Sequence, residues 1–435
     1  MAMDLESLKL LVSRMDNQLI QNQVNLHSKL LEKKVLMEEK CKGKVKNINV
    51  RAGVADAVGL IDPSTNALPG QTSDSIGSSA APTQLYALPA LHMGQARIPY
   101  LSAQTVTKAQ DAVDIVVEEM NEVSASLGQY LGRALLNPIL SLNSASFTPG
   151  DSSTWTATTM TVADRHAFRE GQLVDLFAAS SSAPTGSRIL ILKITDVAAT
   201  SGVAGTVTFS VPDKVEGTQQ SLTTAAAKSA TAIAAGGAAL VLHNSYGSSA
   251  SSNRALFSLA DACGTSTSAM YNQSVSASSW SGNSSGSAAA VTPGRLRDFI
   301  DAIKQRGGEK VHAVIMSRLQ FADFHESLMS NGSGSGVRFF ASGKEDFFGD
   351  TQDADLDFYG CKIIADENCP SGQMYVINRD RVKLGVWKEI SPFDEKNRVE
   401  ATETKAEYLL KIAGMHQLLV TKRNGLGIFV ASDPS

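Results

Sequence analysis

The segment that most constrains the fold runs from about residue 105 to residue 137. Small and apolar side chains recur there every seven residues in two rows: Val106, Val113, Met120, Leu127, Ala134 and Ala109, Val116, Val123, Tyr130. Thr107 and Gln110 have capping-box spacing, and Pro138 ends the pattern. About thirty residues at 1.5 Å each predict a helix of roughly 45 Å, much longer than an average globular helix. A straight rod of this length indicates a structural spine or a coiled coil.

The sequence before this helix offers little with which to build a core. Residues 51–104 are rich in Gly, Ser, Ala and Pro, and they predict an extended functional loop or a disordered one. Only its last part, "ALHMGQARIPYLSA", is expected to pair as a strand. Residues 4–40 predict an amphipathic helix. Its apolar stripe, expected to contact either its own domain or a neighbouring subunit, contains Leu5, Leu8, Val12, Met15, Leu19 and Leu26.

Two further regions follow the long helix. Residues 146–246 contain the strand patterns "QLVDLF", "RILILKITDV", "GTVTFSV" and "AALVLHN", which predict an inserted β-barrel or sandwich. Thr292 and Pro293 then begin a helix that Gly307 ends, and "VHAVIMS" predicts a buried strand. Ser317 and Gln320 are spaced to cap a second helix.

Strand patterns close the chain. Two strands are predicted at Tyr359–Ala365 and Met374–Ile377, within "DFYGCKIIADENCPSGQMYVINRDRVKLGVW". Alternation from Ala406 onward predicts another strand. Asn424-Gly425 lies between "HQLLVTK" and "GIFVA" and predicts a β-hairpin.

Composition excludes several classes of protein. The net charge is −4, with 39 basic and 43 acidic side chains, so the whole chain does not have the charge of a dedicated nucleic-acid binder. A local exception, and the candidate DNA-facing group, is formed by Lys40, Lys42, Lys44 and Lys46. The four cysteines have no paired spacing, which favours a reducing compartment. No apolar run approaches the ~18 residues of a membrane span, and we expect no signal peptide.

The sequence also gives no support for catalysis. Cys361 and Cys369 have no histidine nearby, whereas structural zinc takes four ligands. "GNSSG" lies in Ser-rich sequence without a preceding strand, and no Walker motif occurs. We therefore expect no catalytic residue, no cofactor and no metal, and we interpret "ADEN" and "NRDR" as solvated turns or subunit contacts. A pocket that gathered His312, Ser317 and Asp366 would revive the enzyme hypothesis.

The order of these parts resembles a major capsid protein of tailed double-stranded DNA bacteriophages, with the fold that encapsulins share. The local resemblance is strongest over Thr292–Trp387, where "TPGRLRDFIDAIKQRGGEKVHAVIMSRLQFADF" is similar to the helix, strand and helix of the axial domain. The resemblance implies an α+β fold with seven parts. These are an N-terminal helical arm (1–50), an extended loop (51–104), the spine helix and peripheral domain (105–145), an inserted β domain (146–246), a peripheral or linker segment (247–291), the axial α/β domain (292–387) and a closing β segment (388–435).

The same resemblance implies a structural function, the formation of a protein shell. Pentamers and hexamers would form an icosahedral shell around phage DNA, assembled in the host bacterial cytoplasm and retained in the virion. The implied partners are further copies of the chain, portal, scaffolding and decoration proteins, and weakly contacted DNA. No lysine lies between Lys46 and Lys108, so we expect a non-covalent shell, and we expect no N-terminal trimming. The alternatives are an encapsulin-like shell around an enzyme cargo and another self-assembling phage component such as a tail or sheath subunit.

Overall fold

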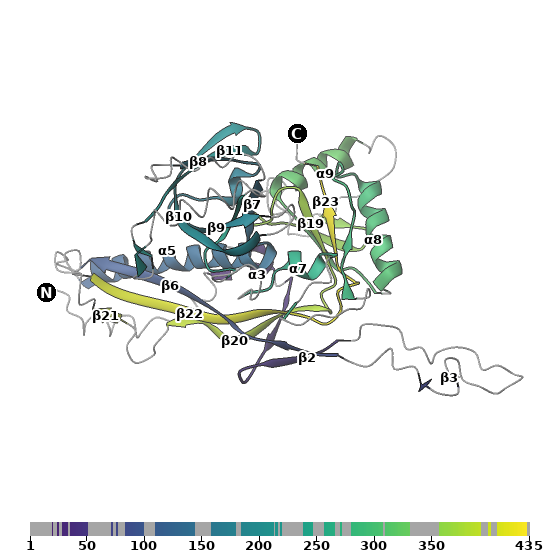
Figure 1. The fold of residues 1–435 in the computed structure, drawn as a ribbon, viewed down its shortest axis with the longest axis horizontal. Helices are drawn as coiled ribbons and strands as arrows, with labels where there is room; N and C mark the ends of the chain where they lie inside the picture. The colour runs from purple at the N-terminus through teal and green to yellow at the C-terminus, as the bar shows by residue number, and fades with distance from the viewer. Residues whose placement is uncertain are drawn as a thin grey trace, which may run out of the picture.

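The computed structural model is an α+β structure with a long helix, α5, laid across a sheet (Figure 1). It describes residues 20, 24–25, 28–33, 35–50, 71–72, 75–76, 83–99, 109–143, 158–179, 184–212, 214–215, 218–219, 238–246, 256–265, 270–271, 280–307, 309–330, 356–392, 399–401 and 407–432. A second sheet lies over α5, and a helix-covered third sheet lies beside it (Figure 1). We call these three the peripheral sheet, the inserted sheet and the axial sheet.

The peripheral sheet supports α5. Its central strands are β20 (Val382–Pro392) and β22 (Glu407–Val420), and its remaining strands are β1 (Met37–Lys40), β21 (Val399–Ala401) and β6 (Ala90–Pro99). The predicted strand in "ALHMGQARIPYLSA" is therefore present as β6, antiparallel to β22. Helix α5 (Ala109–Leu136) runs along β6 and ends before Pro138, as predicted. A Cβ at Gly94 would lie 2.7 Å from Cγ1 of Val123, so the absent side chain lets helix and strand approach.

The expected helix over residues 4–40 is wrong in its last part. The chain forms the short helix α3 (Lys29–Glu32) and then β1, which pairs in parallel with β20. The apolar stripe had already given way to Lys and Glu by this point, and the open edge of β20 supplies hydrogen-bond partners that outweigh local propensity. A ribbon follows, in which β2 (Lys46–Val50) pairs with β5 (Thr83–Ala87). The capping pair at Thr107 lies outside the described residues.

The inserted sheet starts earlier and is more open than the sequence predicted. Its strand order is β7 (Ile139–Asn143), β14 (Ala238–Leu242), β9 (Leu173–Ala179), β10 (Pro184–Ser201), β11 (Ala204–Ser210) and β8 (Thr158–Val162). Strand β7 precedes residue 146 because the chain turns directly from Pro138 into the sheet. In the described part of the chain β7 and β8 are edges, so these strands form an open sheet and no closed barrel. Short elements near it are η1 (Arg165–Ala167), β12 (Lys214–Val215) and β13 (Thr218–Gln219).

The axial sheet has a core on each face. Its order is β15 (Asn283–Ser284), β23 (Gly427–Val430), β19 (Gln373–Ile377), β16 (Ala313–Met316), β18 (Cys361–Ala365) and β17 (Leu356–Phe358). Val314 and Met316 pack beneath α8 (Pro293–Gly307) and α9 (Arg318–Ser330), whereas Ala313 and Ile315 join the core of the peripheral sheet. Ser317 and Gln320 cap α9 reciprocally, as predicted. We call the sheet with α8 and α9 the axial unit.

The hairpin predicted at Asn424-Gly425 is wrong. Strand β22 belongs to the peripheral sheet and β23 to the axial sheet, so these residues link two sheets. The link is held by Arg423, which is 2% exposed and donates to the carbonyl oxygens of Asp261, Ala262, Gly264 and Trp280. Asp261 and Ala262 belong to α7 (Leu259–Cys263), so the guanidinium lies at the negative end of that helix. These long-range bonds outweigh the local turn signal.

Two buried imidazoles lie between α5 and the peripheral sheet. The ring centroids of His92 and His416 are 5.8 Å apart. Burial and the neighbouring His416 lower the pKa of His92 to about 3, and burial lowers the pKa of His416 to about 4 despite Glu389. His92 Nε2, His416 Nδ1 and Ser124 Oγ have no hydrogen-bond partner among the described residues. The native structure therefore holds both rings neutral.

Acid should weaken this layer. Because the folded pKa values lie below the unfolded value near 6.5, their contribution is complete above pH 6.5 and is lost as pH falls toward 4 and 3. Each ring should cost up to about 1.4 kcal/mol per pH unit in that window. Urea unfolding from pH 7 to pH 4.5 should show a smaller acid loss for His92→Met/His416→Met than for the unaltered chain. His325→Gln, at an exposed position, is the control, and equal pH slopes in all three proteins would contradict the prediction.

Candidate assembly surface

Exposed apolar side chains gather where the ribbon joins β6. Nine large hydrophobic residues are exposed in the described part of the chain, and four of them fall within eight residues. These four, which we call the apolar strip, are Tyr86 (45%), Leu88 (53%), Leu91 (52%) and Met93 (48%). Met37 and Val45 are also exposed, in the neighbouring β1–β2 segment. Such a concentration is unusual on a surface that stays in water.

Strand alternation explains why these side chains point outward. The Cβ direction of Gly94 points at Val123 of α5, and His92 and Ala96 on the same face of β6 are buried. Successive side chains of a strand point to opposite faces, so Leu91 and Met93 point away from the helix. In β5, Leu85 and Ala87 are buried and Tyr86 is exposed by the same rule. The helix therefore covers one face of β6 and leaves the other bare.

The ribbon carries part of this surface away from the body. Strands β2 and β5 leave the peripheral sheet together, and β3 (Gln71–Thr72), which pairs with β4 (Ser75–Ile76), lies far from the rest of the molecule (Figure 1). Ile48, Val50, Leu85 and Ala87 of the ribbon are buried, whereas Tyr86 remains exposed.

The N-terminal segment is tied to its own chain at a buried carboxylate. Asp366, at 0% exposure, accepts the backbone N–H of Leu30 at 2.9 Å and that of Asn368 at 2.8 Å. Burial raises the pKa of Asp366 despite these two bonds. The interpretation of "ADEN" as a solvated turn is therefore wrong for Asp366 and Asn368, because α3 packs over them. It is right for Glu367, which remains exposed and pairs with Arg318. A contact across 336 residues left no local signal in the sequence.

The sequence-predicted contact residues are only partly visible. The stripe residues Leu5, Leu8, Val12, Met15, Leu19 and Leu26 lie outside the described residues. Lys40 pairs with Glu389 at 3.2 Å, and Lys46 pairs with Glu39 at 2.7 Å. Hydrogen bonding from Lys46, with a further contribution from Lys383, lowers the pKa of Glu39 despite burial. Lys42 and Lys44 are exposed in the turn between β1 and β2.

His312, Ser317 and Asp366, the pocket that would have supported the enzyme hypothesis, each contact a different partner. His312 lies 3.8 Å from Asp380, Ser317 bonds with Gln320, and Asp366 is occupied by backbone donors. All four cysteines are free and buried. Across the described ranges, no group of three or more His, Cys, Asp or Glu side chains could hold a metal ion, and no helix is long and apolar enough to cross a membrane.

A groove lies beside the apolar strip. Its volume is about 960 Å³, and it lies between β6, α5 and loops of the inserted sheet. Side chains of both charges line it, including Glu119, Glu122 and Arg169. This mixture is typical of a contact surface, and the His243 ring in its lining is hydrogen-bonded through Nδ1 to the buried Asp175 at 2.7 Å.

The solved structures to which this chain is similar are subunits of protein shells. The chain is similar to the capsid of cyanophage A-1(L) (11% identity, 97% of this chain and 93% of that one, TM-score 0.48) and to the capsid of a native GTA particle (6% identity, 94% and 90%, TM-score 0.45). It is also similar to an encapsulin complex from Synechococcus elongatus (8% identity, 93% and 88%, TM-score 0.43). No protein-family model and no curated protein matches the sequence. At these identities and TM-scores, function has to rest on the chain's own geometry.

Removal of the buried carboxylate should release α3. Asp366→Ala would leave the N–H groups of Leu30 and Asn368 without acceptors, at about 1–3 kcal/mol for each buried group. Amide hydrogen exchange at residues 28–33 should become faster, while exchange in α8 should stay unchanged. Glu367→Ala is the matched control because it removes the neighbouring exposed carboxylate. Unchanged protection of Leu30 in Asp366→Ala would contradict this assignment.

Proposed function

We propose that this chain is the major capsid protein of a tailed bacteriophage. Copies of it associate, as pentamers and hexamers, into a closed icosahedral shell around double-stranded DNA. The observation that carries the proposal is the apolar strip, which continues from a projecting ribbon onto β6 and which the described parts of the same chain leave uncovered. Burying such side chains against another copy is favourable by roughly 1.5–3 kcal/mol for each fully covered Leu or Met.

The shape of the chain favours assembly into a shell rather than into a compact oligomer. The ribbon on one side and the body on the other are different surfaces, so a contact between them is heterologous. Heterologous contacts that close by rotation generate rings, and rings are the units from which a shell is built. In the proposed shell, the ribbon lies over a neighbouring copy and the Leu5 to Leu26 stripe contacts another.

The proposed partners follow from charge and chemistry. A net charge of −4 suits a wall that encloses DNA without binding it tightly. Lys40 and Lys46 already pair with carboxylates, which leaves the exposed Lys42 and Lys44 to meet phosphate. Portal, scaffolding and decoration proteins would complete the virion. The subunits hold together without covalent bonds, since no lysine lies in residues 51–104.

An encapsulin-like shell is the second candidate, because the same contacts can enclose an enzyme cargo. The contents of purified particles distinguish the two. Nuclease-protected DNA supports the capsid, and a co-purifying enzyme supports the encapsulin.

The direct test is to make the strip polar. Leu88→Ser/Leu91→Ser/Met93→Ser should reduce particle yield at least tenfold, since about half of each side chain is already exposed in the single chain and its full burial awaits assembly. Particles are counted by negative-stain electron microscopy and by sedimentation. The melting temperature of the unassembled chain should change little.

Leu142→Ser/Leu319→Ser provides the matched control, because Leu142 and Leu319 are 40% and 41% exposed and lie outside the strip. This control should assemble normally. Normal shells from the strip variant, or equal losses in both variants, would refute the assigned surface. A wild-type chain that stays monomeric at high concentration would refute the function itself.

A further inference from the structure

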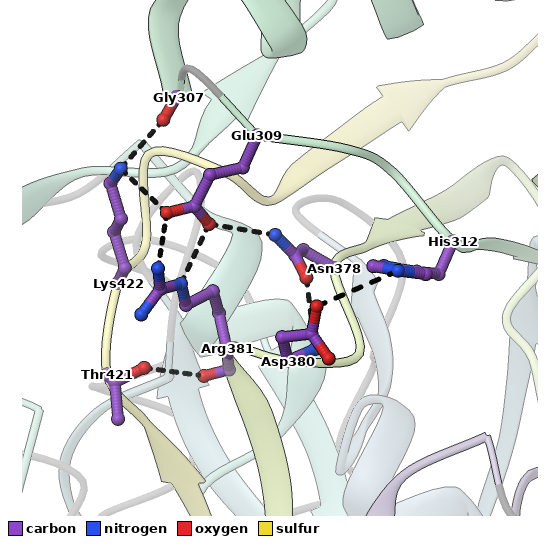
Figure 2. Close-up of polar contacts among 8 residues, drawn as sticks. All are labelled: Gly307, Glu309, His312, Asn378, Asp380, Arg381, Thr421 and Lys422. Atoms are coloured by element: carbon purple, nitrogen blue, oxygen red, sulfur yellow. Dashed lines mark hydrogen bonds and ion pairs between the residues drawn. The ribbon is translucent and has the colours of Figure 1, made fainter.

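Three chain segments meet at one carboxylate, Glu309 (Figure 2). One is the loop after α8, which carries Glu309 itself. Another is the link from β19 to β20, which carries Asn378 and Arg381. The last is the link from β22 to β23, which carries Thr421 and Lys422. The first link passes from the axial sheet to the peripheral sheet and the second passes back, so the carboxylate lies where the two parts join.

Glu309 receives donors from both links. Arg381 donates Nε to Oε2 at 2.8 Å and Nη2 to Oε1 at 2.6 Å, a bidentate pair. Lys422 Nζ donates to Oε1 at 3.1 Å and to the carbonyl oxygen of Gly307 at 2.7 Å. Asn378 Nδ2 donates to Oε2 at 2.9 Å. We call this set the Glu309 joint (Figure 2).

Backbone packing brings the same segments together. A Cβ at Gly307 would lie 2.8 Å from Cα of Gly425 and 3.1 Å from the carbonyl oxygen of Asn424. The end of α8 therefore rests directly on the β22–β23 link. Lys422 adds a cation at the carbonyl end of α8, where the helix dipole favours it. The two links also bond to each other, from Thr421 N to the carbonyl oxygen of Arg381 at 3.0 Å.

We propose that Glu309 is a positioning residue that fixes the angle between the axial unit and the peripheral sheet, and thereby the curvature of the shell. The proposal rests on the shell function proposed above. The apolar contact between the two parts is non-directional. Arg423 holds the β22–β23 link to α7. The bidentate ion pair of Glu309 with Arg381 adds a directional restraint on the β19–β20 link.

Removing the charge should open the joint. Arg381 and Lys422 would then face each other across a neutral side chain, and like charges at this distance repel. Asp380, a second carboxylate beside the joint, lies 3.8 Å from His312 Nε2 and attracts Arg381, but the bonds that join Arg381 to Lys422 all pass through Glu309. The side chains of Glu309, Lys422 and Arg381 are 19%, 30% and 41% exposed, so solvent can enter once the joint loosens.

The test uses one neutral variant and a charge swap. Glu309→Gln keeps the shape and removes the charge, and Glu309→Lys/Arg381→Glu/Lys422→Met reverses the ion pair between positions 309 and 381 without placing two ammonium groups together. In the unassembled chain, amide exchange at residues 378–382 should be about tenfold faster in Glu309→Gln, because one charge-assisted contact is lost. In the swap, the exchange rate of these residues should be close to that of the wild type. Cryo-electron microscopy should show a broadened range of shell diameters, or no shells, in Glu309→Gln and wild-type diameters in the swap.

Lys304→Met is the control, because it breaks the Lys304–Asp301 pair at 3.6 Å within the axial unit and away from both links. Its exchange at the links and its shell diameters should match the wild type. Unchanged exchange at 378–382 in Glu309→Gln, or wild-type diameters from that variant, would overturn the proposal, as would a swap no better than the single variant. A wild-type chain that forms no shells would contradict the proposed function, while the exchange measurement would still decide the joint.

Discussion

The contact of α5 with β6 is the constraint on which the other parts depend. It requires Gly94, since any side chain there would meet Val123. By covering one face of β6, the helix leaves Leu91 and Met93 bare on the other. The far end of α5 positions two further parts. Gly132 lies against Ser28, next to α3, and Pro138 turns the chain into the inserted sheet.

The sequence predicts those elements whose signals are local. The long helix, the Ser317–Gln320 cap and the axial strands β16, β18 and β19 each have their signal within their own segment, and all are present. The failures occur where a distant partner decides. Residues 37–40 look helical until β20 offers an edge, and Asn424-Gly425 looks like a hairpin until the two flanking strands join different sheets. Neither partner can be read from the segment itself.

The candidate surface was harder to predict than the fold. Alternation in "ALHM" marks a strand with two unlike faces, but it does not say which face the helix will take. The sequence suggested that Asp366 was a surface charge, because a buried acid and a solvated one look alike until the donors of Leu30 and Asn368 are in place. The four cysteines have no paired spacing, and in the structure all four are free and buried.

In the proposed shell, the two kinds of contact would have different roles in assembly. Apolar area such as the strip supplies affinity, but it is non-directional and tolerates several angles of approach. A closed shell needs the angle as well as the affinity, since a small error in each subunit accumulates around a ring. Charge-assisted bonds with fixed geometry, such as those that meet at Glu309, can supply the angle while adding little net stability in partly exposed positions. A shell built in this way separates how strongly copies associate, set by Leu88, Leu91 and Met93, from the shape they make together. Each can then change through mutation without altering the other.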